Sequence, residues 1–315
     1  MEYVIQVVNL KKEYELSQAN QAGDKVFQAL RGVSFEVHTG EVFGILGPNG
    51  AGKTTTLEII EGIRKQTSGS VVVLGLDNMD SSHAIKRRIG VQLQSSEYLP
   101  ALTLVELLTL FASIYGTKKD PMQLLGFVGL QEKAKERVKN LSGGQKQRFT
   151  IATSLVNDPE IIFLDEPTTG LDPRARRDLW DLIKQINSRG TTVVLTTHYM
   201  EEAEFLCNRV AIMDHGEILK IDEPKRLIND LAHTTQIAFL TSTELPAGIW
   251  VSIQDQIEKV INQSPKVILE VKSLDVVGKV VYLLKQWNIG FSGFTVRTAS
   301  LEDVYLDLTG KEYEE

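Results

Sequence analysis

The sequence predicts an α/β fold with a mainly parallel sheet over residues 1–222, followed by a small α+β domain over residues 223–315. Two observations support this. In the first part, short runs that are apolar on successive residues alternate with helical patterns, as buried parallel strands and their covering helices do. From about residue 225 the pattern changes to shorter strands and one amphipathic helix. A chain of 315 residues is long enough for two such domains.

Four apolar runs of the first domain predict strands, at residues 41–46, 70–75, 160–165 and 191–197. An interval of about residues 95–158 is different, because it carries helical patterns such as "LTLVELLTLFASIYG" and no strong strand. It predicts a helical subdomain inserted into the α/β core. Residues 209–222 then predict a hairpin that turns at Asp214-His215-Gly216.

The second domain has its own elements. "QIAFL", "KVILEV" and "FTVRT" predict strands, and "SLDVVGKVVYLLKQW" predicts an amphipathic helix. Ser300 is expected to cap a short terminal helix, with Asp303 at its third position. No cluster of histidines, cysteines or paired carboxylates in this domain suggests chemistry, so an accessory or regulatory role is expected.

Composition narrows the possible functions. The formal net charge of −7 argues against bulk binding of nucleic acid. The single cysteine, Cys207, cannot build a disulfide framework or a zinc cluster, and its apolar flanks predict a half-buried thiol. The first residues show no signal peptide, and the apolar runs are shorter than the roughly 20 residues of a membrane span. A membrane function would therefore need another chain to provide the span.

A glycine-rich segment after the first apolar strand fits the pattern G-x-x-x-x-G-K-[ST] and precedes a predicted helix, the context that the motif requires. Its glycines allow successive N–H groups to converge on phosphate oxygens. Lys53 is expected to reach the β- and γ-phosphates, and the Thr54 hydroxyl to ligate Mg²⁺. The candidate nucleotide-binding residues are Gly47, Pro48, Asn49, Gly50, Ala51, Gly52, Lys53, Thr54 and Thr55.

Two acids follow the apolar run 161–164. Asp165 ends the predicted strand level with the phosphate loop, where it can hold Mg²⁺. Glu166 is expected to point towards the γ-phosphate, where it can orient an attacking water or accept its proton. Together the two motifs predict a P-loop NTPase and leave GTPases, kinases, helicases and transport ATPases open.

A second glycine pair lies further along the chain, in "NLSGGQKQR" at 140–148. Ser142 and Gln145 have the spacing of a capping box at a helix start. Gly143 and Gly144 allow the N–H groups of the first turn to face outward, which suits an anion. The sequence therefore contains a second candidate phosphate site.

At "LSGGQKQR" the chain resembles the ATP-binding cassette (ABC) family, over residues 1 to about 222. The family carries this signature between its two nucleotide motifs, as this chain does. The resemblance implies an ATPase that uses ATP and Mg²⁺ and forms a two-fold dimer. In that dimer Ser142, Gly143, Gly144 and Gln145 bind the ATP held by a second cassette, which is another copy of the chain or a paralogue.

The same resemblance implies further site residues. Gln94 is similar to the glutamine that contacts Mg²⁺ or water, although Gln92 is a rival for this position. Asp172 is similar to the aspartate after the acidic motif, and it could also be a helix cap. His198 is similar to the switch histidine at the γ-phosphate, with a strand-end polar residue as the alternative. Tyr14 is similar to the aromatic residue that stacks on adenine.

The ending "TASLEDVYLDLTGKEYEE" resembles the C-terminal extension of drug- and polymer-exporter ATPases of the daunorubicin-resistance type. This resemblance implies an exporter ATPase that powers a separate ABC-2-type membrane permease, and a cytoplasmic location on the inner face of the plasma membrane. The implied catalytic residues are Lys53, Gln94, Glu166 and His198, and the implied Mg²⁺ ligands are Thr54, Gln94 and Asp165. An importer ATPase and a soluble ABC-type ATPase acting on ribosomes or DNA are the alternatives.

Overall fold

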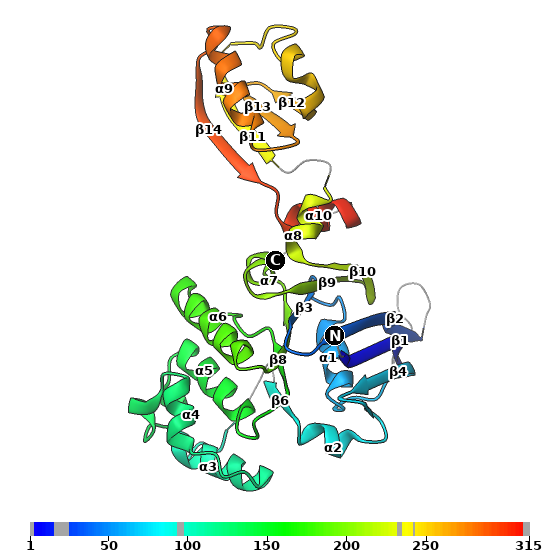
Figure 1. Ribbon diagram of the computed structural model, residues 1–315, viewed down its shortest axis with the longest axis vertical. Coiled ribbons are helices and arrows are strands. Elements are labelled where there is room, and N and C mark those ends of the chain that lie inside the picture. Colours follow the sequence, from blue (N-terminus) through cyan, green and yellow to red (C-terminus); the bar gives the residue numbers. More distant parts are fainter. Residues whose placement is uncertain (1–2, 16–24, 93–97, 232–234, 242, 311–315) are drawn as a thin grey trace. The chain divides into compact units, whose positions relative to one another are not determined.

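The structure, a computed structural model, describes residues 3–15, 25–92, 98–231, 235–241 and 243–310 (Figure 1). It divides into two compact units, of which the first ends at Asp222 and the second begins at Glu223. No helix within these ranges combines the length and the hydropathy that a membrane-spanning segment needs.

A six-stranded sheet forms the centre of the first unit. All of its strands run parallel except the edge strand β10, which pairs antiparallel with β9 in the predicted hairpin. Every residue of β3, β7 and β8 is buried, as expected for strands covered on both faces. The predicted mainly parallel sheet is therefore confirmed. Its order is β10 (Glu217–Asp222), β9 (Arg209–Asp214), β3 (Val42–Leu46), β8 (Thr192–Thr197), β7 (Ile161–Asp165) and β6 (Ile89–Gln92).

The predicted strand at 70–75 does not belong to this parallel sheet. It forms β4, which pairs antiparallel with β1 in a separate four-stranded sheet. Val71 and Val73 are buried while Val72 between them is partly exposed, so only one face of β4 packs on the core. That alternation is typical of an antiparallel sheet with one solvated face. The order is β2 (Val26–His38), β1 (Tyr3–Glu15), β4 (Ser68–Val73) and β5 (Leu76–Asp77).

Helix α1 (Lys53–Ile60) links the two sheets, because it contacts strands of both. Its side chains Leu57, Ile59 and Ile60 are fully buried in the hydrophobic core that the sheets share. The chain enters α1 directly from the carboxyl end of β3 through residues 47–52. This packing fixes Lys53, the first residue of the helix, at the carboxyl edge of the parallel sheet.

Helices, and no strand, form the described residues between β6 and β7, in agreement with the helical pattern. In Figure 1 they gather on one side of the first unit. Thr103 caps the first of them, since its Oγ1 accepts from the Glu106 N–H at 3.4 Å and its own N–H donates to Glu106 Oε2 at 2.8 Å. The helices are α3 (Leu104–Tyr115), α4 (Pro121–Phe127), η1 (Gln131–Lys133), η2 (Val138–Asn140) and α5 (Gly143–Ser154), and the unit also contains α2 (Ser82–Lys86), α6 (Pro173–Ser188) and α7 (Met200–Leu206).

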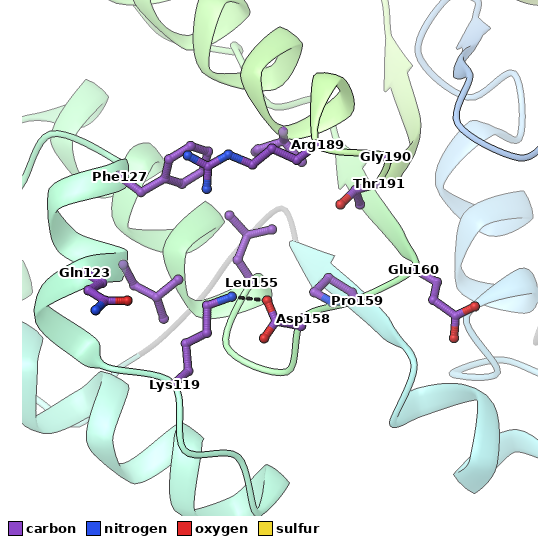
Figure 2. A pocket seen from close by; sticks show the side chains of 12 residues that line it. Lys119, Gln123, Phe127, Leu155, Asp158, Pro159, Glu160, Arg189, Gly190 and Thr191 are labelled. Atoms are coloured by element: carbon purple, nitrogen blue, oxygen red, sulfur yellow. Dashed lines mark hydrogen bonds and ion pairs between the residues drawn. The ribbon is translucent and has the colours of Figure 1, made fainter.

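A cavity of about 480 Å³ lies between α4 and the amino ends of β7 and β8 (Figure 2). Lys119, part of a charged run before α4, extends into it and forms an ion pair with Asp158. Glu160 and Thr191, which line it, directly precede β7 and β8. The cavity therefore lies at the opposite end of these strands from the acidic motif that follows β7.

Cys207 lies deeper than the half-buried position that its sequence flanks predict. It is 9% exposed, and a Cβ atom added at Gly44 would lie only 2.6 Å from its sulfur. Burial raises the pKa of the Cys207 thiol well above its ordinary value, and the negative charges of Glu202 and Glu41 raise it further.

The second unit contains an antiparallel sheet covered by a helix. The three predicted strands and the amphipathic helix α9 (Val276–Gln286) are present, and β12 is an additional strand. The side chains of Val276, Val280 and Leu284 on α9 are buried against the sheet. The strand order is β12 (Ile257–Gln263), β13 (Lys266–Val271), β11 (Thr235–Thr241) and β14 (Phe291–Thr298), with η3 (Val251–Gln256) preceding β12.

Two short helices, α8 (Pro224–Asn229) and α10 (Leu301–Thr309), pack together where this unit begins and ends. Ser300 starts α10 as predicted, because its N–H donates to the Asp303 carboxylate over 2.8 Å and its hydroxyl donates over 3.1 Å. Arg297 also pairs with Asp303, at 3.2 Å. The tail motif therefore closes the unit through a capped helix.

Candidate active site

The turn between β3 and α1 depends on its glycines. Gly50 and Gly52 adopt positive φ angles of 83° and 104°, which side chains with a Cβ atom rarely adopt. At Gly47 an added Cβ atom would lie 2.1 Å from the Met213 carbonyl oxygen. The backbone conformation of the turn therefore requires glycine at these motif positions. The turn brings residues 47–52 to the carboxyl ends of the neighbouring strands.

Lys53 is buried in the centre of this turn. Its side chain is 4% exposed and its Nζ donates to the carbonyl oxygens of Gly47 at 2.7 Å and Pro48 at 3.1 Å. The same Nζ lies 3.3 Å from Glu166 Oε1. Burial lowers the pKa of the Lys53 ammonium, although the charges of Glu166 and Asp165 oppose this.

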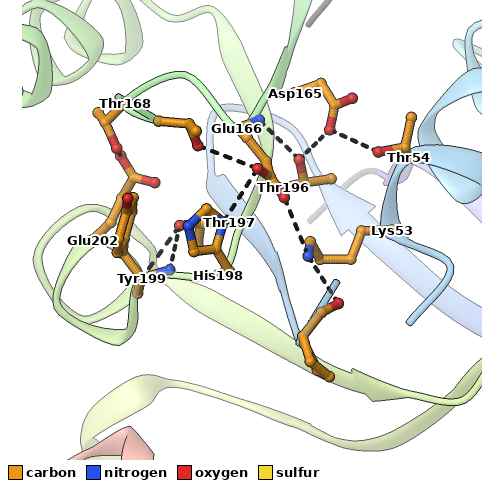
Figure 3. Close-up of polar contacts among 12 residues, drawn as sticks. Lys53, Thr54, Asp165, Glu166, Thr168, Thr196, Thr197, His198, Tyr199 and Glu202 are labelled. Carbon is orange, nitrogen blue, oxygen red and sulfur yellow. Dashed lines mark hydrogen bonds and ion pairs between the residues drawn. The ribbon is translucent and has the colours of Figure 1, made fainter. Parts of the chain in front are cut away.

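Asp165, at the end of β7, forms hydrogen bonds with a residue of α1 and with a residue of β8 (Figure 3). Its Oδ1 accepts hydrogen bonds from Thr54 Oγ1 at 3.2 Å and from Thr196 Oγ1 at 2.5 Å. Burial raises the pKa of the Asp165 carboxyl, and the two threonine hydroxyls work against this rise. A hydroxyl and a carboxylate therefore lie side by side at this edge, and such oxygens are the ligands that Mg²⁺ prefers.

Glu166 lies between two cationic or potentially cationic groups. Its Oε1 faces Lys53, and its Oε2 lies 3.2 Å from His198 Nδ1 (Figure 3). Thr169 Oγ1 also donates to Oε2, at 3.2 Å. Burial alone would raise the pKa of the Glu166 carboxyl, but Lys53 and His198 outweigh it and hold the pKa below its ordinary value. The carboxyl is therefore ionised at neutral pH.

His198 directly follows β8 and is 9% exposed. Its ring lies 4.1 Å from the ring of Tyr199, centroid to centroid. The contact of Nδ1 with Glu166 has ion-pair distance but not hydrogen-bond alignment, and no other described residue bonds to this atom. The structure thus brings together five of the predicted site residues: Lys53, Thr54, Asp165, Glu166 and His198.

The second glycine pair lies at a different place. Ser142 caps α5 as predicted, since its N–H donates to Gln145 Oε1 at 3.0 Å and its Oγ accepts from the Gln145 N–H at 3.4 Å. Added Cβ atoms on Gly143 and Gly144 would meet Leu171 and Ala175. Within the described residues, no hydrogen bond or ion pair joins Ser142 to the turn at residues 47–52.

Asp172 caps α6, the alternative left open from the sequence. Its Oδ1 accepts from the N–H groups of Arg174 at 3.0 Å and Ala175 at 2.9 Å. Tyr14, near the end of β1, has Lys12 and Arg64 over its ring, at 5.0 Å and 5.5 Å from the centroid. Gln94 lies outside the described residues, whereas its rival Gln92 is 2% exposed at the end of β6.

Sequence reasoning missed three side chains near this site. Thr196 bonds to both acidic residues, because its Oγ1 also accepts from the Glu166 N–H at 3.0 Å. Glu61 is 3% exposed, and its pKa rises to about 8 because of burial and then the charges of Asp165 and Glu58. Glu202, four residues after His198, is completely buried. For Thr196 and Glu202 the sequence offered one signal, which is that each is a polar residue close to a known motif.

Comparison with known proteins gives relatives along the whole chain. The family model described as "ABC transporter" matches residues 30–169. The linearmycin resistance ATP-binding protein of Bacillus subtilis is 34% identical over 318 residues, which cover 98% of this chain and 99% of that protein. The Nod factor export ATP-binding protein I of Cupriavidus metallidurans is 34% identical over 324 residues and covers 99% of both.

Solved structures are also similar. The dimeric structure of an ATP-binding cassette in a post-hydrolysis state, bound to ADP and phosphate, aligns with a TM-score of 0.62 and 30% identity. The alignment covers 70% of this chain and 98% of that cassette. The similarity thus extends over a whole cassette and leaves the remaining part of this chain unmatched in that comparison.

Proposed function

The chain belongs to the ABC transporter family of ATP-binding, ATP-hydrolysing subunits, and on that premise we propose how its site turns over ATP and which partners it has. The observation that carries the proposal is the cluster of Lys53, Asp165, Glu166 and His198. All four lie at the carboxyl edge of the parallel sheet, where α/β proteins of this kind bind their ligands.

The turn at residues 47–55 is proposed to hold the phosphates of ATP. Its backbone N–H groups and the N-terminus of α1 favour anions, and Lys53 adds a full positive charge. The buried Lys53 Nζ already lies among the carbonyl oxygens of Gly47 and Pro48, so little side-chain freedom is lost when phosphate oxygens approach. Tyr14 is proposed to stack on the adenine ring.

Thr54 and Asp165 are the residues proposed to hold Mg²⁺, with Gln94 as a further contact. Their hydroxyl and carboxylate oxygens lie 3.2 Å apart, which fits two protein ligands beside phosphate oxygens. When bound, Mg²⁺ compensates the charge of the phosphates. Thr196 holds Asp165 in this orientation through its hydroxyl.

Glu166 is proposed to orient the attacking water and to accept its proton, and His198 to contact the γ-phosphate. The lowered pKa of the Glu166 carboxyl keeps it ionised and ready to accept a hydrogen bond from water. Lys53 and His198 lie on either side of it, so the three groups converge on one small region. Catalysis then rests on positioning and charge compensation.

Ser142, Gly143, Gly144 and Gln145 are proposed to bind the ATP of a second cassette, most simply another copy of this chain. The capped start of α5 presents N–H groups suited to phosphate. Among the described residues, Ser142 forms hydrogen bonds with Gln145 of its own helix and none with the chain's own phosphate turn. A two-fold dimer gives each nucleotide both cradles. The similar cassette with ADP and phosphate is likewise dimeric.

An integral-membrane permease of the ABC-2 type is the proposed partner, with export as the direction of transport. The two relatives that match along the whole chain are named for linearmycin resistance and Nod factor export. Helix α3 offers exposed apolar side chains for the contact: Leu110, Ile114 and Tyr115. The chain is proposed to work at the cytoplasmic face of the membrane that holds the permease.

Glu166→Gln tests the proposed mechanism. Gln keeps the size of the side chain but cannot accept the proton of water, so steady-state ATP hydrolysis should fall by about 100-fold or more while ATP binding persists. Glu160→Gln is a matched control. Glu160 is exposed and directly precedes β7, whereas Glu166 directly follows it. Glu160→Gln should hydrolyse ATP at the parental rate. Parental ATPase activity of Glu166→Gln would refute the role of Glu166.

The partner is tested by co-expressing the chain with a candidate ABC-2-type permease from the same genome. A stable complex whose ATPase activity changes with the permease substrate supports the proposal. Stable association with ribosomes or DNA, or a partner that also requires an extracytoplasmic binding protein, would contradict the assignment as an exporter subunit.

A further inference from the structure

Glu202 is a buried carboxyl group that the proposed mechanism does not use. It lies on α7, four residues after His198, and is 0% exposed. Figure 3 shows its side chain to one side of Glu166 and His198, beside Tyr199 and directed towards Thr168. A carboxyl group buried to this extent is costly unless hydrogen bonds compensate it, so its partners indicate its role.

Two donors from different segments meet at one oxygen of this group. Thr168 Oγ1 donates to Glu202 Oε1 at 2.8 Å, and Trp180 Nε1 donates to the same atom at 2.9 Å. Thr168 and Trp180 are themselves buried, at 0% and 3% exposed. Burial raises the pKa of the Glu202 carboxyl, while hydrogen bonding from Thr197, Thr168 and Trp180 and the charge of Arg176 counteract this.

These donors belong to the segments that carry the proposed site residues. Thr168 lies in the turn that starts at Glu166, and Trp180 lies on α6, the helix that Asp172 caps. Glu202 itself follows His198. A second contact joins the same segments, because the Arg176 guanidinium of α6 lies 4.2 Å from the centroid of the Tyr199 ring.

We propose that Glu202 is a positioning residue for ATP hydrolysis: its carboxylate ties the turn that begins at Glu166 to the segment that carries His198. The inference rests on the proposed function of Glu166 and His198. These two side chains lie 3.2 Å apart, but the residues directly follow different strands, β7 and β8. Glu202 fixes their relative position without touching the nucleotide.

Loss of this link should affect the kinetics of ATP hydrolysis in a way that a general loss of fold stability would not. A displacement of about 1 Å at a reacting group can reduce turnover by about 100-fold. Nucleotide binding depends mainly on the turn at residues 47–55, which Glu202 does not contact. Loss of the link should therefore lower kcat for ATP and leave KM nearly unchanged.

Two near-isosteric substitutions remove the donors one at a time. Thr168→Val removes the hydroxyl with little change in volume, and Trp180→Phe removes the indole N–H while keeping a ring to stack on Phe205. Each should lower kcat several-fold. The double variant should lower kcat by about tenfold or more, with KM for ATP within about twofold of the parent.

Glu202→Gln is the conservative variant. Its amide oxygen can accept both hydrogen bonds, so kcat should remain close to that of the parent even if the melting temperature falls. Glu202→Ala removes the acceptor and should reproduce the kcat loss of the double variant. If Glu202→Ala does not fold, the Thr168 and Trp180 variants alone decide the outcome.

Thr192→Val is the matched control. Thr192 is 1% exposed at the other end of β8, and its Oγ1 accepts a single hydrogen bond from the Gly40 N–H at 2.9 Å. It should lower the melting temperature to a similar extent as Thr168→Val and leave kcat unchanged.

Steady-state ATPase assays of the full chain, with melting temperatures for each variant, give a clear decision. Parental kcat in the folded Thr168→Val/Trp180→Phe variant would overturn the inference. The inference would also be overturned if kcat fell in step with the melting temperature in every variant, Thr192→Val included. That result would indicate a structural role only. An unsubstituted chain with no ATPase activity would instead refute the proposed function, and this inference with it.

Discussion

At the scale of single residues, Glu166 has an unusual backbone. Its φ angle of 46° lies in the left-handed region, which costs a residue with a side chain about 1–3 kcal/mol. Thr196 offsets this cost, because its hydroxyl accepts from the Glu166 N–H and donates to Asp165. One threonine therefore fixes both acids, and the strained turn directs the Glu166 side chain back towards Lys53 and His198.

Glu61 makes the stability of the chain depend on pH. The folded chain keeps the proton on Glu61 up to a pKa of about 8, whereas the unfolded chain loses it near the ordinary value of 4.5. Between these values the folded state binds more protons, so the free energy of unfolding falls as pH rises and levels off above about pH 8. At pH 8 Glu61→Gln should therefore be more stable than the parent, by up to about 5 kcal/mol.

Urea denaturation without nucleotide, at pH 5 and pH 8, measures this difference. The advantage of Glu61→Gln should be small at pH 5 and largest at pH 8. Glu132→Gln, at an exposed residue of η1, should change neither value. An advantage of Glu61→Gln that is equal at both pH values would show that its origin is not the buried proton.

At the scale of elements, Asp172 can be tested as a helix cap separately from any role at the dimer. Asn caps a helix about as well as Asp, whereas Ala does not, so Asp172→Ala should lower the free energy of unfolding by about 1 kcal/mol and Asp172→Asn by much less. Denaturation curves give both values. If both variants lose ATPase activity equally, the carboxylate charge of Asp172 has a role separate from capping. If Asp172→Asn keeps its activity, the role of Asp172 is that of a helix cap.

The elements that could be predicted from the sequence are those with local signals. The strand before Asp165 is a continuous apolar run, and the starts of α5 and α10 carry Ser with Gln or Asp three residues later. β1 and β12 have mixed polar and apolar residues because only part of each is buried, so their patterns are weak. The run at 70–75 looked like a parallel strand although β4 pairs antiparallel.

The candidate site was predictable where a motif carries the chemistry, as for Lys53, Asp165 and Glu166. Contacts between segments far apart in sequence were not. Thr168 and Glu202 are 34 residues apart and meet only through the packing of α6 and α7. No local pattern encodes such a pair, since each residue alone is an ordinary polar residue after a motif.

At the scale of the whole molecule, Ser142 tests whether two chains share a nucleotide. In the Glu166→Gln background, ATP should produce a stable dimer, because slow hydrolysis keeps the shared phosphate in place. Adding Ser142→Arg introduces a long side chain at the start of α5 and should abolish the dimer while ATP binding remains. Size-exclusion chromatography with light scattering measures both states.

Two controls separate this effect from damage to α5. Ser142→Ala removes only the cap, at a cost of about 1 kcal/mol, and should still permit some dimer. Ser188→Arg adds the same bulk and charge to an exposed serine at the end of α6. ATP-dependent dimers of Ser142→Arg would mean that the second glycine pair does not contact the partner's nucleotide.

The burial of Cys207 turns the natural chain into a convenient background for site-specific probes. Its only thiol is shielded beside Gly44 and has a raised pKa, so thiol-reactive labels attack it slowly. A cysteine introduced at an exposed position, such as Ser188, would take up a spin label or fluorophore alone, without prior removal of other thiols. Distances between two labelled copies could then be followed through a complete ATP cycle, in a chain that differs from the natural one at a single residue.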